Sequence, residues 1–505
     1  MNEWIKKSLQ LCIDPGDTPE NSFEELQNQF NLFNENQRME IVKILKQQLE
    51  ANDLIYVLSR FVRYMSIKEF EETLICEIYN LDTDCFCGSM LELQIISRIK
   101  GNYQLKKLLH EKNVSRFDTV LKFHSEYTPI ENRNSKRIAI ITEQFLSSLH
   151  APTKIVSNFI YVIQKILGYE VLLFVCPSDY SLPADIWDSP EGMFSISQFK
   201  NQPFNMSYKD IIINGYQINM CDHNLKEYHM MFSIIKNWNP LFVLSMGTIN
   251  PIVDLINKFT TLITMDMTSQ CPISTAEYLL RFVYTNDEDE QVYSDSLSKN
   301  QKQIFLHNKM PVINEETINP SEVASRDILH LPEEKFLIAI VGNRLDKEID
   351  NQFIDVMWNI FKSSPNIAFV IIGEVISLPD RLKHFESDSI YYLGYREDLF
   401  NVYKCLDLYI NPNRNGGGFS SSIALNAGIP VICLPQGDVA YNVGKNFTVD
   451  SYEEMQNTVY KYVTDQNFYN RQIELANEVA KSNTEEKMNS YVTDIINTIK
   501  KTLDI

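Results

Sequence analysis

The chain lacks a surplus of positive charge and has no long apolar run. Its 505 residues include 46 lysines and arginines against 66 aspartates and glutamates, a formal net charge of −20. This balance argues against a duplex nucleic acid partner and against binding to an anionic membrane by bulk charge. No stretch approaches the ~18 apolar residues of a membrane span. The start, MNEWIKKSLQLCIDPGD, lacks the apolar core of a signal peptide, so we expect a cytoplasmic protein.

Patterned cysteines and metal-binding motifs are missing as well. The nine cysteines are scattered, with Cys85 and Cys87 as the one close pair, and this spacing fits neither a zinc site nor a disulfide framework. We expect reduced thiols. Two acidic clusters occur, DTD at 82–84 and DEDE at 287–290. They lie in a helical region and in a polar stretch, so we interpret both as solvated carboxylates and predict no metal site.

Residues 1–135 show helical patterns almost throughout. In EIVKILKQQLE, apolar residues stand at 41, 42, 44, 45 and 49, the spacing of one helix face. NDLIYVLSRFVRYM and LELQIISRIKGNYQLKKLLHEK follow the same spacing, and no repeat of fixed period is found. We predict an all-α N-terminal domain over 1–135, with a role in acceptor or partner recognition, and a linker at EYTPIENRNSKR.

Apolar strands then alternate with helices in two successive blocks. In 136–330 the expected strands are RIAIITE, YEVLLFVC, KDIIING, PLFVLSMG and TTLITMD, and 283–303 is expected to be a polar surface excursion. In 331–480 they are KFLIAIVG, IAFVIIGE, SIYYLGY, DLYINP and PVICLP, before a helical tail at 481–505. Continuous apolar strands between helices indicate parallel sheets covered on both faces. We predict an α/β fold of two doubly wound, Rossmann-like domains, with ligands at the carboxyl strand edges facing a cleft.

A glycine-serine junction, NGGGFSSSIALNAG, stands between a strand and a helix of the second block. Gly416, Gly417 and Gly418 allow a ligand to approach the main chain. A helix start offers free N–H groups and a partial positive charge, and the hydroxyls of Ser420 to Ser422 can cap it or bind an anion. The pattern predicts a phosphate cradle, and the alternative is a flexible loop with an ordinary serine N-cap.

Two cations follow the first strand of the same block, in VGNRLDKEID. Arg344 and Lys347 would lie at the carboxyl edge of that strand, where they can neutralise a diphosphate leaving group. A solvated charged loop is the alternative. In YYLGYREDL, at 391–399, the tyrosines either hold a nucleobase by stacking and backbone hydrogen bonds or pack under the following helix.

The order of these motifs resembles the C-terminal donor domain of GT-B glycosyltransferases. The basic loop, LGY-REDL, the strand ending NP, the small-residue loop and AGIPV follow one another in that order. The chain is similar to the O-GlcNAc transferases and the bacterial cytoplasmic adhesin N-glucosyltransferases over roughly 137–480, with counterparts at MWNIFKSSPNIAFVII and at the loop from Gly417 to Ser421. AGIPV and GNRL with its lysine are shared with the group 1 transferases.

The resemblance implies roles for individual residues. Lys347 and Arg344 would stabilise the diphosphate, and the LGY backbone would bind the base. FLSSLHAPTKIV is similar to the family's HPTSH loop, with His150 as its first histidine and Lys154 or Ile155 at the second. His150 would act as a general base or a donor ligand, unless it makes only a structural hydrogen bond. The implied donor-binding set is Glu374, Leu393, Gly394, Tyr395, Gly417, Gly418, Phe419, Ser420, Ser421, Ser422 and Asn426.

The sequence departs from these families at the helix after the phosphate loop. They place a carboxylate there to bind the ribose hydroxyls, and this chain has Ile423, with Asn426 one turn later. Asn415 stands where the group 1 pattern has its first glutamate.

Two functions of different classes remain open. The first is a metal-independent glycosyltransferase that needs no cofactor and moves a sugar from a nucleotide diphosphate sugar, UDP-glucose or UDP-GlcNAc, to an acceptor such as a protein or peptide. The second is an inactive GT-B subunit that serves as partner or substrate-binding module, in a homo- or hetero-oligomer. Other sugar-nucleotide enzymes of this fold, epimerases or phosphorylases, complete the alternatives.

Overall fold

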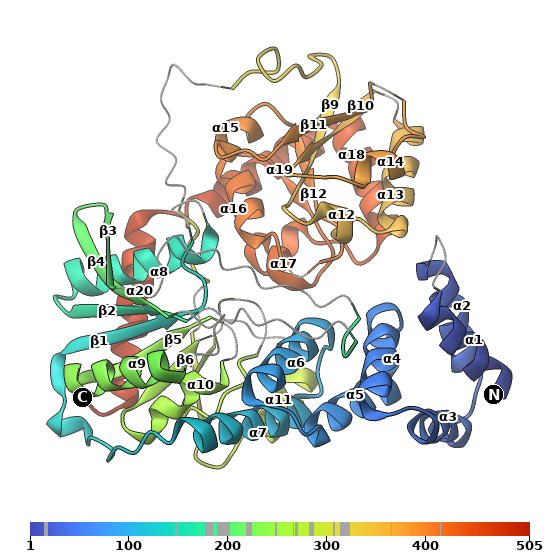
Figure 1. Cartoon of the computed structure of the whole chain (residues 1–505). Coiled ribbons are helices and arrows are strands. Elements are labelled where there is room, and N and C mark those ends of the chain that lie inside the picture. Colours follow the sequence, from blue (N-terminus) through green and yellow to red (C-terminus); the bar gives the residue numbers. More distant parts are fainter. Residues whose placement is uncertain are drawn as a thin grey trace. The chain divides into compact units, whose positions relative to one another are not determined.

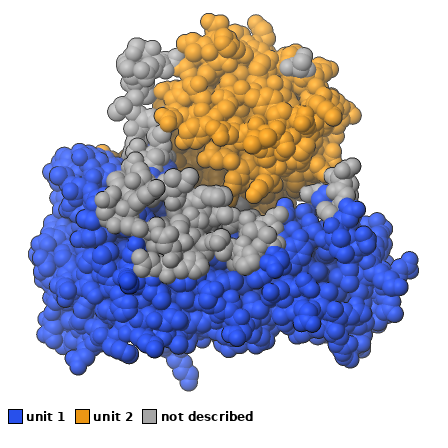
Figure 2. Space-filling model, viewed as in Figure 1, with its two compact units in different colours: residues 1–305 blue, residues 306–505 orange. Residues whose placement is uncertain are grey.

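The structure is a computed structural model. It describes residues 1–14, 19–146, 150–176, 185–188, 203–218, 225–247, 250–265, 267, 271–281, 287–306, 309–313, 324–364, 366–386, 388–414 and 416–505. The chain divides into two compact units, residues 1–305 and residues 306–505 (Figures 1 and 2). None of the helices in these ranges is long and apolar enough to cross a membrane.

The first unit begins with a helical region, in which the described residues form no strand before Asn134. Its helices are α1 (Asn2–Ile13), α2 (Pro19–Asn31), α3 (Glu35–Gln48), α4 (Ala51–Tyr64), α5 (Lys68–Asn80), α6 (Cys85–Arg98), α7 (Tyr103–Leu121) and the 3-10 helix η1 (Ile130–Asn132). The segment from Leu91 to Lys112 divides between α6 and α7 because Gly101 and Asn102 both have positive φ. Strand β1 starts inside the predicted linker, which is therefore shorter than expected.

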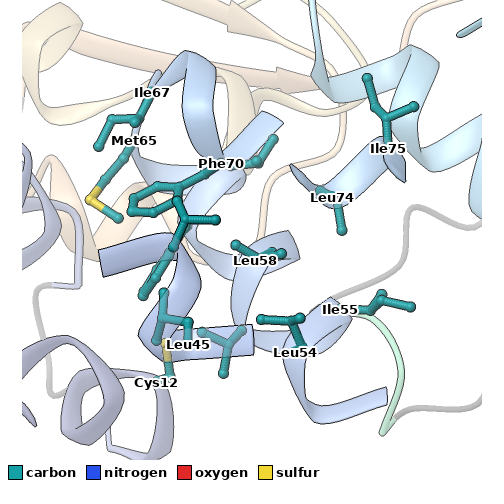
Figure 3. Packing of buried hydrophobic residues seen from close by; sticks show 14 of the residues in the cluster. Cys12, Leu45, Leu54, Ile55, Leu58, Met65, Ile67, Phe70, Leu74 and Ile75 are labelled. Carbon is teal, nitrogen blue, oxygen red and sulfur yellow. The ribbon is translucent and has the colours of Figure 1, made fainter. Parts of the chain in front are cut away.

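Aromatic side chains form the centre of the helical region. Trp4 and Phe30 pack with ring centroids 5.2 Å apart, and Phe61 and Phe70 with centroids 5.0 Å apart. Figure 3 shows Phe70 close to Met65 and Ile67, with Leu45, Leu54 and Leu58 in the same apolar cluster. Burying each such side chain contributes about 1.5–3 kcal/mol. The helical spacing in the sequence therefore corresponds to real core faces.

The first sheet has the strand order β3-β4-β2-β1-β5-β6-β7-β8. Its strands are β1 (Asn134–Thr142), β2 (Glu170–Val175), β3 (Pro203–Tyr208), β4 (Ile211–Gln217), β5 (Pro240–Met246), β6 (Leu262–Met265), β7 (Tyr278–Arg281) and β8 (Lys302–Phe305). Its helices are α8 (Ala151–Tyr161), the π-helix η2 (Val162–Ile166), α9 (Leu225–Trp238), α10 (Pro251–Asp254), η3 (Leu255–Lys258) and α11 (Asp287–Ser296). The parallel arrangement is as predicted, except that β3 runs antiparallel to β4.

The expected surface excursion at 283–303 is wrong, because it contains α11 and the start of β8. Tyr293 on α11 is 1% exposed. The reading of DEDE as solvated is also wrong at Glu290, which is buried and bonds Arg281 at 2.6 Å. In DTD, by contrast, Asp84 is exposed and accepts two backbone N–H bonds at the start of α6.

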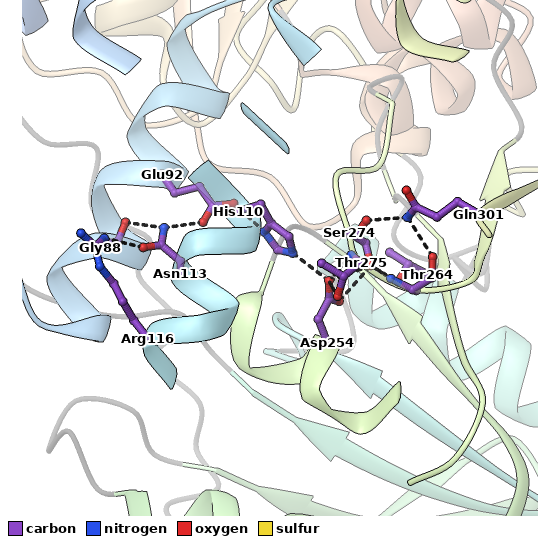
Figure 4. A network of polar contacts seen from close by, with 11 residues as sticks. Gly88, Glu92, His110, Asn113, Arg116, Asp254, Thr264, Ser274, Thr275 and Gln301 are labelled. Atoms are coloured by element: carbon purple, nitrogen blue, oxygen red, sulfur yellow. Dashed lines mark hydrogen bonds and ion pairs between the residues drawn. The ribbon is translucent and has the colours of Figure 1, made fainter. Parts of the chain in front are cut away.

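A buried charge network ties the helical region to the first sheet (Figure 4). His110 on α7 is fully buried, with Nδ1 2.6 Å from Glu92 of α6 and Nε2 2.7 Å from Asp254 of α10. Asn113 donates to Glu92 at 2.7 Å, and the Ser274 hydroxyl donates to Asp254 at 2.9 Å. Desolvation lowers the pKa of His110, but the two carboxylates outweigh it and raise the pKa to about 10. The imidazolium therefore joins helices and sheet within one unit.

The second unit has a parallel sheet with the order β11-β10-β9-β12-β13. Its strands are β9 (Phe336–Val341), β10 (Ile367–Ile372), β11 (Ile390–Gly394), β12 (Leu408–Ile410) and β13 (Val431–Ile432). Its helices are α12 (Leu345–Glu348), α13 (Asn351–Ser363), α14 (Leu378–Arg381), α15 (Leu399–Tyr403), α16 (Gly418–Asn426), α17 (Gly437–Val443), the 3-10 helix η5 (Lys445–Phe447), α18 (Tyr452–Thr464), α19 (Gln466–Ala480) and α20 (Glu485–Thr502). Every strand predicted for this block is confirmed.

The cysteines agree with the expectation of reduced thiols. Eight of them fall in the described ranges, and all eight are free. The ninth, Cys221, lies outside the described residues. Burial raises the pKa of Cys12 and of Cys433 to about 12, so these thiols behave as small apolar side chains.

Candidate functional site

The carboxyl ends of β9 and β10 are joined main chain to main chain. Gly342 donates its N–H to Ile372 at 3.0 Å, and Gly373 donates to the carbonyl of Gly394 at 2.8 Å. A Cβ on Gly373 would lie 1.9 Å from the carbonyl oxygen of Gly342, and Gly373 has φ +138°. Because only glycine fits there, the main chains pack closely at these strand ends, from which the loops of the site extend.

The glycine loop leads into a helix as predicted, but α16 already begins at Gly418, so Ser420 to Ser422 lie inside the helix and none of them caps it. Gly417 is the N-cap, with φ +95° and no side chain capping the helix. The first helical hydrogen bond runs from Ser421 N to Gly417 O at 3.0 Å. The amides of Gly418, Phe419 and Ser420 precede it, so they point out of the helix start and can receive an anion.

The three serines of this helix have different positions. Ser421 and Ser422 are fully buried, and both donate their hydroxyls to the carbonyl of Gly418, at 2.9 and 3.1 Å. Ser420 is half-buried and donates to the carbonyl of Gly417 at 2.9 Å. The hydroxyls of Ser421 and Ser422 therefore support the loop from inside, and Ser420 remains beside the amides.

Arg414 is the main residue that the sequence reasoning missed. Its side chain is 5% exposed, and Nη1 lies 2.5 Å from a carboxylate oxygen of Glu348. Nη2 donates to Val341 O at 2.5 Å and to the Tyr409 hydroxyl at 3.0 Å, and Nε donates to Asn411 at 2.9 Å. Burial lowers the pKa of Arg414, but Tyr409 and Glu348 raise it by more, so the guanidinium is charged.

Two glycines make room for that guanidinium. A Cβ on Gly342 would lie 2.2 Å from Arg414 Nη1, and one on Gly417 would lie 2.6 Å from Nη2. Arg414 stands two residues before the first loop glycine, in NRNGGG, but its guanidinium partners Glu348 and Val341 come from distant segments, so no local pattern revealed its role. The glycine triplet thus accommodates a buried cation as well as a tight turn.

Arg344 lies at the same loop, as predicted. Its side chain is 64% exposed, and Nη2 lies 3.0 Å from Glu348 Oε1. A Cβ on Gly416 would meet Arg344 Nη2 at 3.3 Å. Glu348 therefore bridges Arg344 and Arg414, whose guanidinium groups lie close to Gly416 and Gly417.

Lys347 and Glu374 are exposed, and within the described ranges no hydrogen bond or ion pair involves either side chain. Asp346, next to Lys347, accepts backbone N–H bonds from Ile376 and Leu378, which follow Glu374, at 2.8 and 2.7 Å. Desolvation raises the pKa of Asp346, but these bonds lower it to below its ordinary value. Asp346 thus fixes α12, which carries Lys347, against the loop that carries Glu374.

The tyrosine-rich edge satisfies parts of both interpretations. Tyr391 and Leu393 pack against the apolar core of the second unit. Tyr395 is 50% exposed and follows Gly394, whose φ is +63° and whose carbonyl is bonded to Gly373. Tyr395 and Tyr392, which is 41% exposed, are therefore the rings available for stacking, whereas the Gly394 carbonyl already has a donor.

The residues at the expected ribose position face away from the loop. Ile423 is 5% exposed and belongs to the apolar core. Asn426 donates to Val312 O at 3.0 Å and accepts from Asn483 at 2.7 Å, so its amide holds neighbouring segments together. Asn415 lies outside the described residues.

His150 stands at the corresponding edge of the first sheet, where it begins α8 after β1. It does not cap the helix with its side chain, and Nδ1 is buried without a hydrogen-bond partner among the described residues. Desolvation lowers the pKa of His150 below its ordinary value of 6.5, so the imidazole is neutral at pH 7. Ser147 to Leu149, in the same loop, lie outside the described residues.

The part of the chain that carries the loops of the second unit is similar to a known protein family. Residues 335–465 match the family described as Glycosyl transferases group 1. This part of the second unit is thus similar to a group 1 glycosyltransferase domain. The loops of the second unit described above, from Arg344 after β9 to the start of α16, all lie within the matched residues.

Solved structures agree on the fold. A mutant of the Thermobaculum terrenum O-GlcNAc transferase is similar to 99% of this chain over 97% of its own, with a TM-score of 0.57 and 11% identity. The chain thus has the GT-B fold with a helical N-terminal region. An E. coli structure bound with UDP-2-fluoro glucose (TM-score 0.49, 9% identity, 72% of this chain and 99% of that one) and Anabaena HepE with UDP and glucose (0.48, 10%, 72% and 99%) are too distant to add to this assignment. No curated protein sequence is significantly similar to the chain.

Proposed function

We propose that the protein transfers a sugar from a nucleotide diphosphate sugar, with UDP as the nucleotide, to an acceptor. The observation that supports this most is the glycine start of α16 beside Arg344 and Arg414, at the carboxyl edge of the sheet in the residues that match the group 1 family. A helix start and neighbouring cations together can bind a diphosphate and stabilise it as it leaves.

Each residue has a separate role in this proposal. The amides of Gly418, Phe419 and Ser420 bind the phosphate oxygens, and exposed Arg344 and Lys347 neutralise their charge. Arg414 holds the loop in place from within the protein. Tyr395 offers a face for the base, with Leu393 and Gly394 shaping that edge. Two cations and a helix start supply the positive charge that a metal ion would otherwise provide.

His150 is proposed as the general base or sugar ligand on the other unit. A neutral imidazole at pH 7 can accept a proton from an acceptor hydroxyl or amide. A protein or peptide acceptor in the cytoplasm, with UDP-GlcNAc or UDP-glucose as donor, is the finer proposal. It is supported by the likeness, along nearly the whole chain, to a protein named as an O-GlcNAc transferase.

A GT-B subunit without chemistry is the second candidate. Its support is Ile423, which is buried in the core where the related families place a carboxylate. Without that group the ribose hydroxyls lose one charged partner.

Calorimetric titration with UDP separates the two. We expect micromolar affinity that falls about tenfold or more in Lys347→Ala and in Arg344→Ala, because each removes a charge-assisted contact. Lys461→Ala, an exposed lysine on α18, is the matched control and should bind UDP as the wild type does. Absence of UDP binding in the wild type would favour the inactive subunit.

A further inference from the structure

A cavity lies at one edge of the first sheet, opposite the edge at which His150 stands. It occupies about 430 Å³ at the amino-terminal end of β2, whereas His150 follows the carboxyl end of the parallel strand β1. This volume is within the usual range of small-molecule sites, about 300–1,000 Å³. We call it the β2 groove, and it is lined by Gln164, Tyr169, Glu170, Val171, Leu172, Asn214 and Trp238.

Two aromatic rings in the β2 groove are held by cations. Lys136 Nζ lies 5.6 Å from the centre of the Tyr169 ring, and the Arg137 guanidinium carbon lies 5.5 Å from that of Trp238. Trp238 is half-buried and packs against the core of the first unit. Rigid, partly exposed rings of this kind offer a flat apolar surface with a polar edge.

The polar groups of the groove are uncharged or already neutralised. Within the described ranges, the side-chain amides of Gln164 and Asn214 have no hydrogen-bond partner. Glu170 accepts from Arg137 Nε at 2.8 Å through one oxygen, which leaves its other oxygen as an acceptor. Two amides and one carboxylate oxygen supply both donors and acceptors in a small space.

The backbone around the groove is irregular. Gln164 belongs to the π-helix η2, and Tyr169 N donates to Ile163 O at 3.0 Å to close the turn after it. A π segment widens the helix, departs from the favoured geometry and is found frequently at functional sites. Here it sets the positions of Gln164 and Tyr169, two of the groove's side chains.

We propose that the β2 groove binds a saccharide of one or two pyranose rings. The C–H face of a pyranose stacks on aromatic rings, and its hydroxyls pair with amides and carboxylates as both donors and acceptors. A phosphate or nucleotide fits less well, because the guanidinium of Arg137 already pairs with Glu170. Under the proposed function, this site holds an acceptor that already carries sugar while the other edge of the sheet adds the next one.

Saturation-transfer NMR on the full chain tests the proposal, with glucose, N-acetylglucosamine, galactose, maltose, cellobiose and lactose as probes. We expect at least one to bind. The double variant Gln164→Ala, Asn214→Ala should raise its Kd about tenfold or more, because two hydrogen bonds are lost. The matched control is Gln466→Ala, Asn470→Ala, which removes an exposed amide pair that bonds only within α19.

Three results would overturn the proposal: no probe binds, the double variant binds as the wild type does, or saturating UDP displaces the probe. Release of nucleotide from sugar donors is measured on the same samples and should be equal in wild type and double variant. If the chain binds the saccharide but releases no nucleotide from any donor, the result refutes the proposed transferase activity. It still supports saccharide binding at the β2 groove.

Discussion

Arg414 places a buried positive charge against the glycine loop and shares Glu348 with the exposed Arg344. Glu348 lies 66 positions away in the sequence, so no local pattern announces the pair. The exposed cations were predictable because they directly follow an apolar strand. The buried one was not, since its partners come from three different segments.

Replacing Arg414 by alanine should destabilise the protein by about 3–5 kcal/mol, because Glu348 loses the partner of a buried pair. Urea unfolding measures the change. Arg396→Ala is the control, since Arg396 forms a half-exposed pair with Asp398 that contributes about 1 kcal/mol or less. Equal losses in the two variants would contradict the assigned role of Arg414.

Gly373→Ala should prevent stable folding of the second unit. The new Cβ would lie 1.9 Å from the carbonyl oxygen of Gly342. Because that oxygen belongs to the main chain, only a movement of the backbone could relieve the overlap. Gly168→Ala is the matched control: its φ is +70° and nothing lies within 4 Å, so it should cost only about 1–2 kcal/mol of strain. Circular dichroism and thermal unfolding compare them, and a native-like Gly373→Ala would refute the close packing of these strand ends.

At the scale of elements, α16 combines a glycine start, the proposed phosphate site, with inward-facing hydroxyls. The sequence predicted the glycine loop and a helix after it from local rules for backbone freedom, but the helix starts at Gly418 and no serine caps it. It did not predict which hydroxyls face inward, because that depends on where Gly418 places its carbonyl. The same limit applies to β3, β7, β8 and α11, which the sequence did not predict and whose positions depend on tertiary contacts, such as those that bury Tyr293 of α11.

Ser420→Ala should weaken UDP binding about fivefold, the effect of one lost hydrogen bond of about 1 kcal/mol. Ser422→Ala should leave the affinity unchanged, because its hydroxyl is buried and bonded to Gly418. Titration calorimetry on both variants provides the comparison. A larger effect at Ser422 would mean that the buried hydroxyl reaches the ligand.

The buried charge network around His110 on α7 makes the free energy of unfolding depend on pH. The pKa of His110 in the folded protein, about 10, exceeds its ordinary value of 6.5. Its charge therefore stabilises fully below about pH 6.5, and that contribution is lost as the pH rises toward 10. The difference in unfolding midpoint between wild type and His110→Gln should shrink over this interval. A difference that stays constant would show that the imidazole is not charged.

At the scale of the whole molecule, the proposed general base His150 belongs to the first unit and the proposed donor-binding residues belong to the second. His150→Ala should lower the transfer rate by about 100-fold or more, the usual contribution of a general base, and leave UDP affinity unchanged. Because burial lowers the pKa of His150 below 6.5, the wild-type rate should fall only at acidic pH. A rate profile for His150→Ala with the same acidic limb would assign that limb to another group.

The most direct test of the central claim is a donor-hydrolysis screen on the full chain. Purified protein is incubated with UDP-glucose, UDP-GlcNAc, UDP-galactose and GDP-sugars, and released nucleotide is measured. We expect slow release from one UDP-sugar, reduced strongly in Lys347→Ala and maintained in Lys461→Ala. No release from any donor, together with no thermal shift by UDP or GDP, would contradict it and identify a GT-B subunit without chemistry.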